Sequence, residues 1–140
     1  MQINHRRVFE LSKWLDGLAR KRKTSFKSLK YSAIPKNGGV YVISEFGGPK
    51  EAVLYIGQTK NLRERVYRNH WQGNLQASNF KKLLVRHKKA RDKGDAKEYL
   101  KKNCSVRWVV VEDKKERLAR EHYATAVLNP QFKSRKPKET

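Results

Sequence analysis

Apolar positions near the start of the chain follow a helical period. They recur at spacings of three and four residues: Val8, Leu11, Leu15 and Leu18. This spacing predicts a helix over about residues 2–20. The chain then turns strongly basic, with Arg-Lys-Arg-Lys at residues 20–23. We interpret residues 1–33 as a helical extension and a basic linker, whose charges either contact phosphate or form a solvated face.

The middle of the chain changes to strand-like apolar runs. Two such runs, at residues 40–43 and 52–56, flank Gly47-Gly48-Pro49. They predict a β-hairpin with a turn rich in glycine and proline. A register centred on the middle glycine sets Tyr41 opposite Tyr55, so that both phenols lie on one face of the sheet. The two tyrosines are then either site residues or half-buried aromatics of the sheet.

Helices and one further strand account for the rest of the chain. Periodicity predicts helices over about residues 61–71, 78–93, 96–102 and 117–128, and an apolar run predicts a strand over residues 106–112. Asn61 suits the N-cap of the first of these helices, and Pro130 ends the last. This order predicts a small α+β domain with a mostly antiparallel three-stranded sheet flanked by helices. We divide the chain into the basic extension 1–33, a domain over 34–133 and a basic tail over 134–140.

The net charge narrows the possible partners. The 140 residues include 34 Lys and Arg against 13 Asp and Glu, which gives a formal charge of +21. This charge on a single small domain implies a polyanionic partner, either nucleic acid or an anionic membrane. The longest apolar run, at residues 108–111, is far shorter than the roughly 20 residues that cross a bilayer. Nucleic acid, and not membrane, is therefore the expected partner.

Cysteine content and the N-terminal residues indicate a compartment. Cys104 is the only cysteine, which excludes an intrachain disulfide and a cysteine-based zinc site. Residues 1–23 are charged throughout, and no apolar leader is predicted there. We expect a reducing, cytoplasmic location, with association with the nucleoid in a bacterial host. We also expect a monomer, with dimerisation on DNA as an alternative.

Two charged residues fall where a helix is expected to be apolar. Arg65 lies next to Val66 and borders the apolar stripe of its helix, so it either lies over the core or faces a site. Glu121 shares its helical face with Leu118, Ala124, Thr125 and Leu128. A carboxylate in this position needs a partner, which is either a metal ion or Arg117 one turn earlier. One isolated acid suggests at most one ion.

Four short blocks resemble the GIY-YIG nuclease superfamily. Gly39-Val40-Tyr41 and Tyr55-Ile56-Gly57 look like its two signature tripeptides, and residues 58–65 are similar to the stretch that carries its essential arginine. Residues 118–121 (Leu-Ala-Arg-Glu) resemble the helix with its metal-binding glutamate, and residues 128–132 (Leu-Asn-Pro-Gln-Phe) resemble its closing segment. The blocks occur in the right order over about residues 34–133, which makes them more specific than any one tripeptide.

The resemblance implies a metal-dependent endonuclease that hydrolyses DNA phosphodiester bonds. Tyr41 would activate the attacking water, Tyr55 would position the water or the phosphate, and Arg65 would balance charge on the phosphate. Glu121 would hold one divalent ion, Mg²⁺ or Mn²⁺. The residues expected to bind nucleic acid are Gly57, Lys60, Arg63, Arg68 and Lys133.

Tyr41 can act as the base only if its surroundings lower the pKa of its phenol. A tyrosine has an ordinary pKa near 10, so Tyr41 can act as a base only where cations or a metal lower that value. The chain supplies cations in excess, and we expect them to lower the pKa of Tyr41. A guanidinium and an ion directed at the developing phosphate charge would then provide electrostatic catalysis.

Two positions depart from the family pattern. Many members have a histidine four residues after the arginine, where this chain has Asn69 and His70 follows one residue later. On an α-helix His70 lies about 100° further round, so it is expected to join the catalytic residues only if the helix ends early. The family also commonly has an asparagine directly after the last aromatic, where this chain has Lys133. These departures favour the alternative of a non-catalytic or weakened nucleic-acid-binding module, and a structure-selective RNA nuclease is a third alternative.

Overall fold

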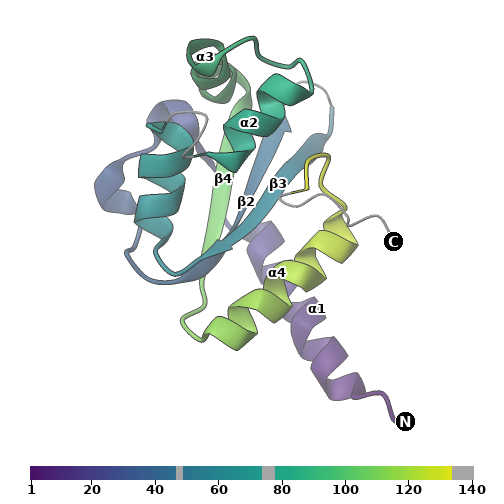
Figure 1. The fold of residues 1–140 in the computed structure, drawn as a ribbon. Helices are drawn as coiled ribbons and strands as arrows, with labels where there is room; N and C mark the ends of the chain where they lie inside the picture. Colours follow the sequence, from purple (N-terminus) through teal and green to yellow (C-terminus); the bar gives the residue numbers. More distant parts are fainter. Residues whose placement is uncertain (47–48, 74–77, 134–140) are drawn as a thin grey trace.

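The computed structural model describes residues 1–46, 49–73 and 78–133, which form an α+β fold (Figure 1). Within these residues the sheet has four strands, β1 (Thr24–Ser25), β2 (Gly39–Phe46), β3 (Glu51–Thr59) and β4 (Cys104–Val110). Their order is β1-β4-β2-β3, and each neighbouring pair is antiparallel. The α+β class and the antiparallel sheet are confirmed, whereas the predicted number of three strands is wrong. The predicted basic tail lies outside the described residues.

The additional strand, β1, lies in the segment that the sequence predicts as a basic linker. Thr24 pairs with Val106 and Ser25 pairs with Ser105, at the free edge of β4. Two residues are too few to show an alternation of apolar and polar positions. Strand formation here therefore depends on the neighbouring strand, which no local pattern reveals.

The hairpin of β2 and β3 is confirmed, but its register differs from the predicted one. Tyr41 pairs with Gly57 and Tyr55 pairs with Ile43, and a β-bulge follows between Ile43 and Ser44. The pairing is shifted by two residues, which keeps each side chain on its predicted face because the strand period is two. The two tyrosines are diagonal neighbours on one face, with ring centres 6.2 Å apart. The predicted turn at residues 47–48 lies outside the described residues.

Apart from two short helices in the predicted linker, the helices fall close to the predicted segments. They are α1 (His5–Arg20), η1 (Phe26–Ser28), η2 (Tyr31–Ala33), η3 (Arg63–Trp71), α2 (Asn79–Arg86), α3 (Lys93–Asn103) and α4 (Lys114–Leu128). The helix predicted over residues 78–93 ends at Arg86, because Lys88 takes a left-handed φ of 58° and interrupts the helix. Asp92 then caps α3 by accepting a hydrogen bond from the Asp95 N–H at 2.9 Å.

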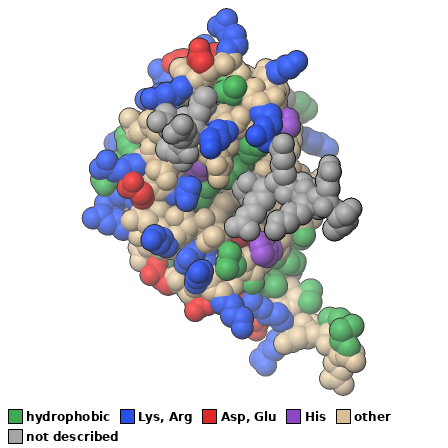
Figure 2. Space-filling model, in the orientation of Figure 1, with side chains coloured by type: hydrophobic (Ala, Val, Ile, Leu, Met, Phe, Trp, Pro, Cys, Tyr) green, Lys and Arg blue, Asp and Glu red, His purple; other side chains and the backbone are tan. Residues whose placement is uncertain are grey.

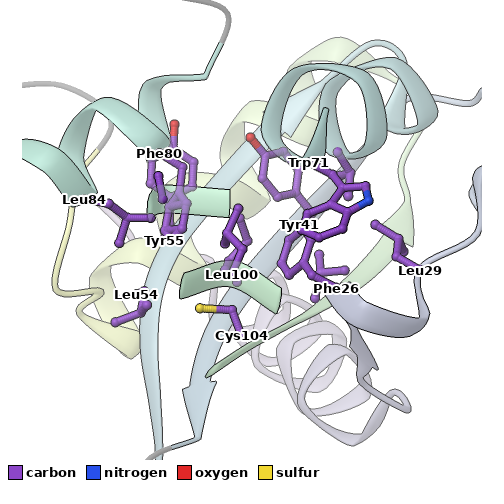
Figure 3. Close-up of a cluster of buried hydrophobic side chains, with 14 of the residues drawn as sticks. Phe26, Leu29, Tyr41, Leu54, Tyr55, Trp71, Phe80, Leu84, Leu100 and Cys104 are labelled. Atoms are coloured by element: carbon purple, nitrogen blue, oxygen red, sulfur yellow. The ribbon is translucent and has the colours of Figure 1, made fainter. Parts of the chain in front are cut away.

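The sheet separates two layers of helices (Figure 1). On one face, η3, α2 and α3 cover the larger core, which includes Phe26, Tyr41, Tyr55, Phe80 and Leu100 (Figure 3). On the other face, α1 and α4 cover Val40, Val42 and Ile56. A hydrogen-bonded ion pair at 2.7 Å also joins Arg7 of α1 to Glu116 of α4. The N-terminal segment therefore contributes to both layers.

Neither a membrane span nor a disulfide is found in the described chain. None of its helices has both the length and the apolar character needed to cross a bilayer. The one cysteine, Cys104, is a free thiol buried in the core. Burial raises the pKa of this thiol to about 12, so it remains protonated at neutral pH.

Candidate active site

A cleft of about 960 Å³ opens beside the edge strand β3, between α4 and the start of α2. Four of the predicted catalytic residues line it: Tyr41, Tyr55, Arg65 and Glu121. They come from β2, β3, η3 and α4 respectively. Figure 3 shows the two phenol rings rising from neighbouring strands on the same side of the sheet. Four elements therefore contribute one polar side chain each to a single concave site.

Tyr41 reaches this cleft across Gly57. The two residues are paired in the sheet, and Gly57 is buried. A Cβ atom added to Gly57 would lie 2.3 Å from the Tyr41 hydroxyl oxygen, far inside van der Waals contact. Glycine is therefore required here, because it lets the phenol lie over the outer strand. Gly57 also lines the cleft, and its contact with nucleic acid stays a prediction.

The winding of η3 brings His70 against Tyr41. Residues Arg63–Trp71 form a π-helix, in which hydrogen bonds join residues five apart. The Gln72 N–H, for example, donates to the Tyr67 carbonyl at 2.8 Å. Arg65 and His70 are five residues apart, so the wider turn brings them closer to one side of η3 than an α-helix would. His70 thus contacts Tyr41 although the helix does not end early, because the helix continues with a wider turn.

Tyr41 and His70 form a buried hydrogen-bonded pair. The Tyr41 hydroxyl lies 2.7 Å from Nε2 of His70, and Nδ1 of His70 lies 2.7 Å from Oγ of Ser78. Burial, with help from Arg65 and Lys81, lowers the pKa of His70 to about 3, so the ring is neutral at pH 7. A neutral imidazole has one acceptor and one donor nitrogen. Nε2 can therefore accept a hydrogen bond from the Tyr41 hydroxyl while Nδ1 donates to Ser78 Oγ.

The prediction that surrounding cations lower the pKa of Tyr41 is wrong, because the protein groups around it leave that pKa raised. Burial raises the pKa of Tyr41 well above its ordinary value, and Tyr55 adds to this rise while Arg65 opposes it. Burial also raises the pKa of Tyr55, again against Arg65. Most of the lysines and arginines lie at the surface, where water screens them, whereas Tyr41 is only 2% exposed. Tyr41 is thus a phenol with a proton acceptor beside it and not a preformed phenolate.

Glu121 presents its carboxylate to the cleft from α4. The side chain is 13% exposed, and its Oε2 lies 3.5 Å from Nε2 of the exposed His122. Among the described residues, Arg117 does not pair with Glu121 but donates to Gln58 Oε1 at 2.9 Å and to the Glu112 carbonyl at 3.0 Å. The predicted alternative, a salt bridge between Glu121 and Arg117, is therefore wrong. A carboxylate in a solvent-accessible cleft fits Mg²⁺, which takes oxygen ligands and keeps several waters when one or two carboxylates hold it.

Sequence reasoning missed other residues of the cleft. Asn79, Lys114 and His122 line it. The Asn79 side chain hydrogen-bonds toward Tyr55 and favours its ionised form. Ser78 is the N-cap of α2 and accepts a hydrogen bond from the Lys81 N–H at 3.0 Å. A capping signal at Ser78 marks the start of α2, but it does not show that this helix end meets the tyrosines.

The residues predicted to bind nucleic acid do not all lie at the cleft. Lys133 lines the cleft, and Lys60 is exposed just beyond β3. Arg63 and Arg68 lie against the ring of Tyr31 instead. Asn129 ends α4 with a left-handed φ of 46°, a conformation that asparagine adopts at helix C-termini.

The cleft is thus lined by phenol, guanidinium and carboxylate groups from elements far apart in the chain, and the buried imidazole of His70 lies behind Tyr41. Any function must be argued from this arrangement and from the charge around it. Comparison of the sequence with models of known protein families and with curated proteins finds no match.

Proposed function

We propose that the protein is an endonuclease that hydrolyses DNA phosphodiester bonds with one divalent ion, Mg²⁺ or Mn²⁺. The observation that supports this proposal is the single cleft lined by Tyr41, Tyr55, Arg65 and Glu121. Hydrolysis of a phosphodiester requires removal of a proton from water and stabilisation of negative charge on the phosphate. The phenols and His70 suit the first task, and Arg65, together with a divalent ion that Glu121 would hold, suits the second.

The proton path runs through Tyr41 to His70. The attacking water passes a proton to the Tyr41 oxygen as the Tyr41 proton moves to Nε2 of His70, 2.7 Å away. The hydroxide forms a bond to phosphorus as the bond from phosphorus to the leaving oxygen breaks. The leaving oxygen takes a proton from solvent water, and His70 returns its proton through Tyr41 to solvent. A bound phosphodiester brings negative charge into the cleft, which favours the protonated ring of His70. Tyr55 orients the water or the phosphate.

Charge on the phosphate is balanced by groups around the cleft. Arg65 is the cation that opposes the pKa rise of both tyrosines, so its field acts where the phosphate would lie. Lys114 and Lys133 line the same cleft and suit the neighbouring phosphates of the strand. An ion held by Glu121 would supply Lewis-acid stabilisation of the phosphate and the leaving oxygen.

The surface around this site suits a polyanion. Figure 2 shows Lys and Arg side chains over much of the visible face, with fewer Asp and Glu among them. The formal charge of the chain is +21. Each phosphate that these cations neutralise on duplex DNA would add about −0.9 to the slope of log K against log salt. DNA binding is therefore expected to weaken steeply as salt rises.

The test is cleavage of supercoiled and branched DNA with Mg²⁺ or with chelator. We compare the wild type with Glu121→Ala and with Glu98→Ala, which removes an exposed acid on α3. The wild type and Glu98→Ala should cut only with Mg²⁺. Glu121→Ala should lose about a thousand-fold in rate, because metal stabilisation of the transition state contributes several kcal/mol.

The same assay identifies the alternatives. If the wild type binds DNA but leaves every substrate intact, or if Glu121→Ala cuts as well as the wild type, the nuclease proposal is wrong and a binding module remains. Cleavage of structured RNA without cleavage of DNA would assign the RNA alternative. Glu121→Ala should bind DNA at least as tightly as the wild type, because it removes a negative charge from a phosphate site. A large loss of affinity would show that Glu121 has a structural role instead.

A further inference from the structure

A second hollow, of about 380 Å³, lies on another side of η3. Its lining residues are Tyr31, Tyr67, Arg68 and Gln72. Tyr31 comes from η2, in the N-terminal segment, whereas the other three belong to η3 or directly follow it. Arg65, on the same helix, lines the cleft described above. One π-helix therefore carries side chains of two separate concave sites.

Two aromatic rings form one wall of this hollow. The ring centres of Tyr31 and Tyr67 are 5.4 Å apart, and the ring planes are inclined by 74°. In an edge-to-face pair, each ring keeps at least one face that its partner does not cover. Tyr67 packs against the core, whereas Tyr31 is 38% exposed. An exposed tyrosine supported by a second, anchored tyrosine is a surface on which an unpaired base can stack.

Two arginines surround the outer ring. The guanidinium carbons of Arg63 and Arg68 lie over the Tyr31 ring, 4.8 and 5.3 Å from its centre. A base that stacks here therefore packs against a guanidinium plane as well as the ring, and both are surfaces on which unpaired bases stack. A hydrogen bond from Arg68 and the charges of both arginines lower the pKa of the Tyr31 phenol. Positive potential is therefore concentrated at the hydroxyl end of this ring, where an anion would be attracted.

Both guanidinium groups keep donors for a further ligand. Arg63 donates through Nε to the Ile34 carbonyl at 2.7 Å. Nε of Arg68 lies 3.5 Å from Oε2 of Glu64 in an ion pair whose side chains are 60% and 56% exposed. Ion pairs as exposed as this one contribute little to stability. A guanidinium has five N–H donors. Each arginine can therefore bind a phosphate oxygen in addition to its present partner.

We propose that this hollow binds one unpaired nucleotide of a nucleic-acid strand, with the base against Tyr31 and the phosphate against Arg63 and Arg68. A duplex cannot supply this ligand, because its bases are stacked inside the helix. An acidic peptide would engage the arginines but gain nothing from the rings. The consequence for the substrate rests on the proposed function. If the cleft cuts DNA, the hollow favours substrates with a single-stranded segment beside the cleavage site, such as a flap or a branch.

The test measures binding in the presence of chelator, so that no strand is cut. Fluorescence anisotropy compares a labelled oligothymidylate with an abasic strand of the same length and backbone. Tyr31→Ala should weaken binding of the oligothymidylate by about 5- to 150-fold, the range for loss of one base–aromatic stack. Its binding to the abasic strand should be unchanged. Tyr31→Phe, which keeps the ring, should bind both strands like the wild type.

Further variants separate the roles of ring, charge and folding. Arg68→Ala should weaken binding of both strands and reduce the salt slope by about 0.7. Tyr31→Leu keeps an apolar contact with Tyr67 and should lose the preference for bases, even if Tyr31→Ala folds poorly. Tyr99→Ala is the matched control, because this tyrosine lies beside Lys89, 5.8 Å from its ring centre, and not in the hollow.

The outcomes for the two proposals are distinguishable. If Tyr31→Ala and Tyr31→Leu keep the full preference for the base-containing strand, or lose affinity equally for both strands, the nucleotide site is wrong. In that case the cluster only attaches η2 to η3. A protein that cuts no DNA but shows a Tyr31-dependent preference for bases would refute the nuclease proposal and support the nucleotide site. Mg²⁺-dependent cleavage without this preference would support the nuclease proposal and refute the nucleotide site.

Discussion

The hydroxyl oxygen of Tyr41 lies 2.7 Å from Nε2 of His70, and this contact depends on the π-helical winding of η3. In an α-helix, residue 69 would share the side of Arg65, and His70 would turn away from it. The wider turn of the π-helix brings His70 back toward that side. π-Helical turns are often found at functional sites, and here the π-helix brings Nε2 of His70 to the Tyr41 hydroxyl.

Replacing His70 with glutamine tests whether this acceptor takes part in the reaction. The glutamine amide can accept the Tyr41 hydrogen bond but cannot take up a proton, so cleavage should fall by about 100-fold or more, as for loss of a positioned acid–base group. Single-turnover cleavage with circular dichroism measures both rate and folding. His5→Gln, in the exposed first turn of α1, is the control. Wild-type rates in a folded His70→Gln protein would exclude the relay.

The same histidine should make stability depend on pH. The folded pKa of about 3 lies below the ordinary 6.5, so between these values the unfolded chain binds a proton that the folded chain does not. Stability should therefore fall as pH decreases through this window, by the order of a few kcal/mol. Above pH 6.5 the ring is neutral in both states and the effect vanishes.

Urea unfolding of the wild type and His70→Gln at several pH values isolates this contribution. Carboxylates titrate in both proteins, so only the difference between the two free energies of unfolding reports on residue 70. That difference should shrink or reverse as pH falls from about 6.5 toward 3. Parallel pH profiles would mean that the pKa of His70 in the folded protein is not lowered.

Gly57 and Gly17 offer a matched pair of glycine to alanine substitutions. A Cβ at Gly57 would lie 2.3 Å from the Tyr41 hydroxyl oxygen, whereas a Cβ at Gly17 meets nothing within 4 Å. Gly57→Ala should destabilise the fold by about 1 to 3 kcal/mol and displace Tyr41 from His70. Gly17→Ala should stabilise α1 by about 0.5 to 1 kcal/mol.

Thermal unfolding and cleavage assays measure both effects. Gly57→Ala should lose activity at temperatures where it is still folded, while Gly17→Ala should keep full activity with a higher midpoint. If Gly57→Ala has wild-type stability and activity, Tyr41 does not need the space above the glycine.

The parts of the site that could be predicted from the sequence are those that leave a local signal. Tyr41 and Tyr55 share a face because the strand period of two survives a register shift of two residues. Arg65 and Glu121 interrupt apolar helical faces, which indicates that each has a polar partner or a site beside it. Both line the cleft, although the partner suggested for Glu121, Arg117, binds Gln58 instead.

Other features depend on packing and could not be read from the chain. The π-helical winding of η3 has no periodic signature of its own, so the face of His70 was assigned from α-helical geometry. The high pKa of Tyr41 follows from burial, whereas composition reports only the total charge. The hollow at Tyr31 joins η2 to η3, and neither segment alone indicates a binding surface.

Lys81 holds the end of η3 from α2. Its side chain is fully buried, and Nζ donates to the Trp71 carbonyl at 2.9 Å and to the Gly73 carbonyl at 2.7 Å. Burial, with Lys97 and Lys93 nearby, lowers its pKa to about 8 from 10.5. The unfolded chain therefore binds a proton more tightly than the folded chain between these values, so this residue should make the fold more stable as pH rises through them.

Lys81→Met keeps the length of the side chain but removes both the charge and the donor. From pH 7.5 to 9.5, the wild type should gain about 1 to 2 kcal/mol relative to Lys81→Met, as measured by urea unfolding. Lys82→Met, at the exposed neighbouring position, should show the same pH dependence as the wild type. Because η3 also carries Arg65 and His70, Lys81→Met should reduce cleavage even where it is fully folded. Equal pH profiles for Lys81→Met and the wild type, together with unchanged cleavage, would show that the end of η3 is held by other contacts.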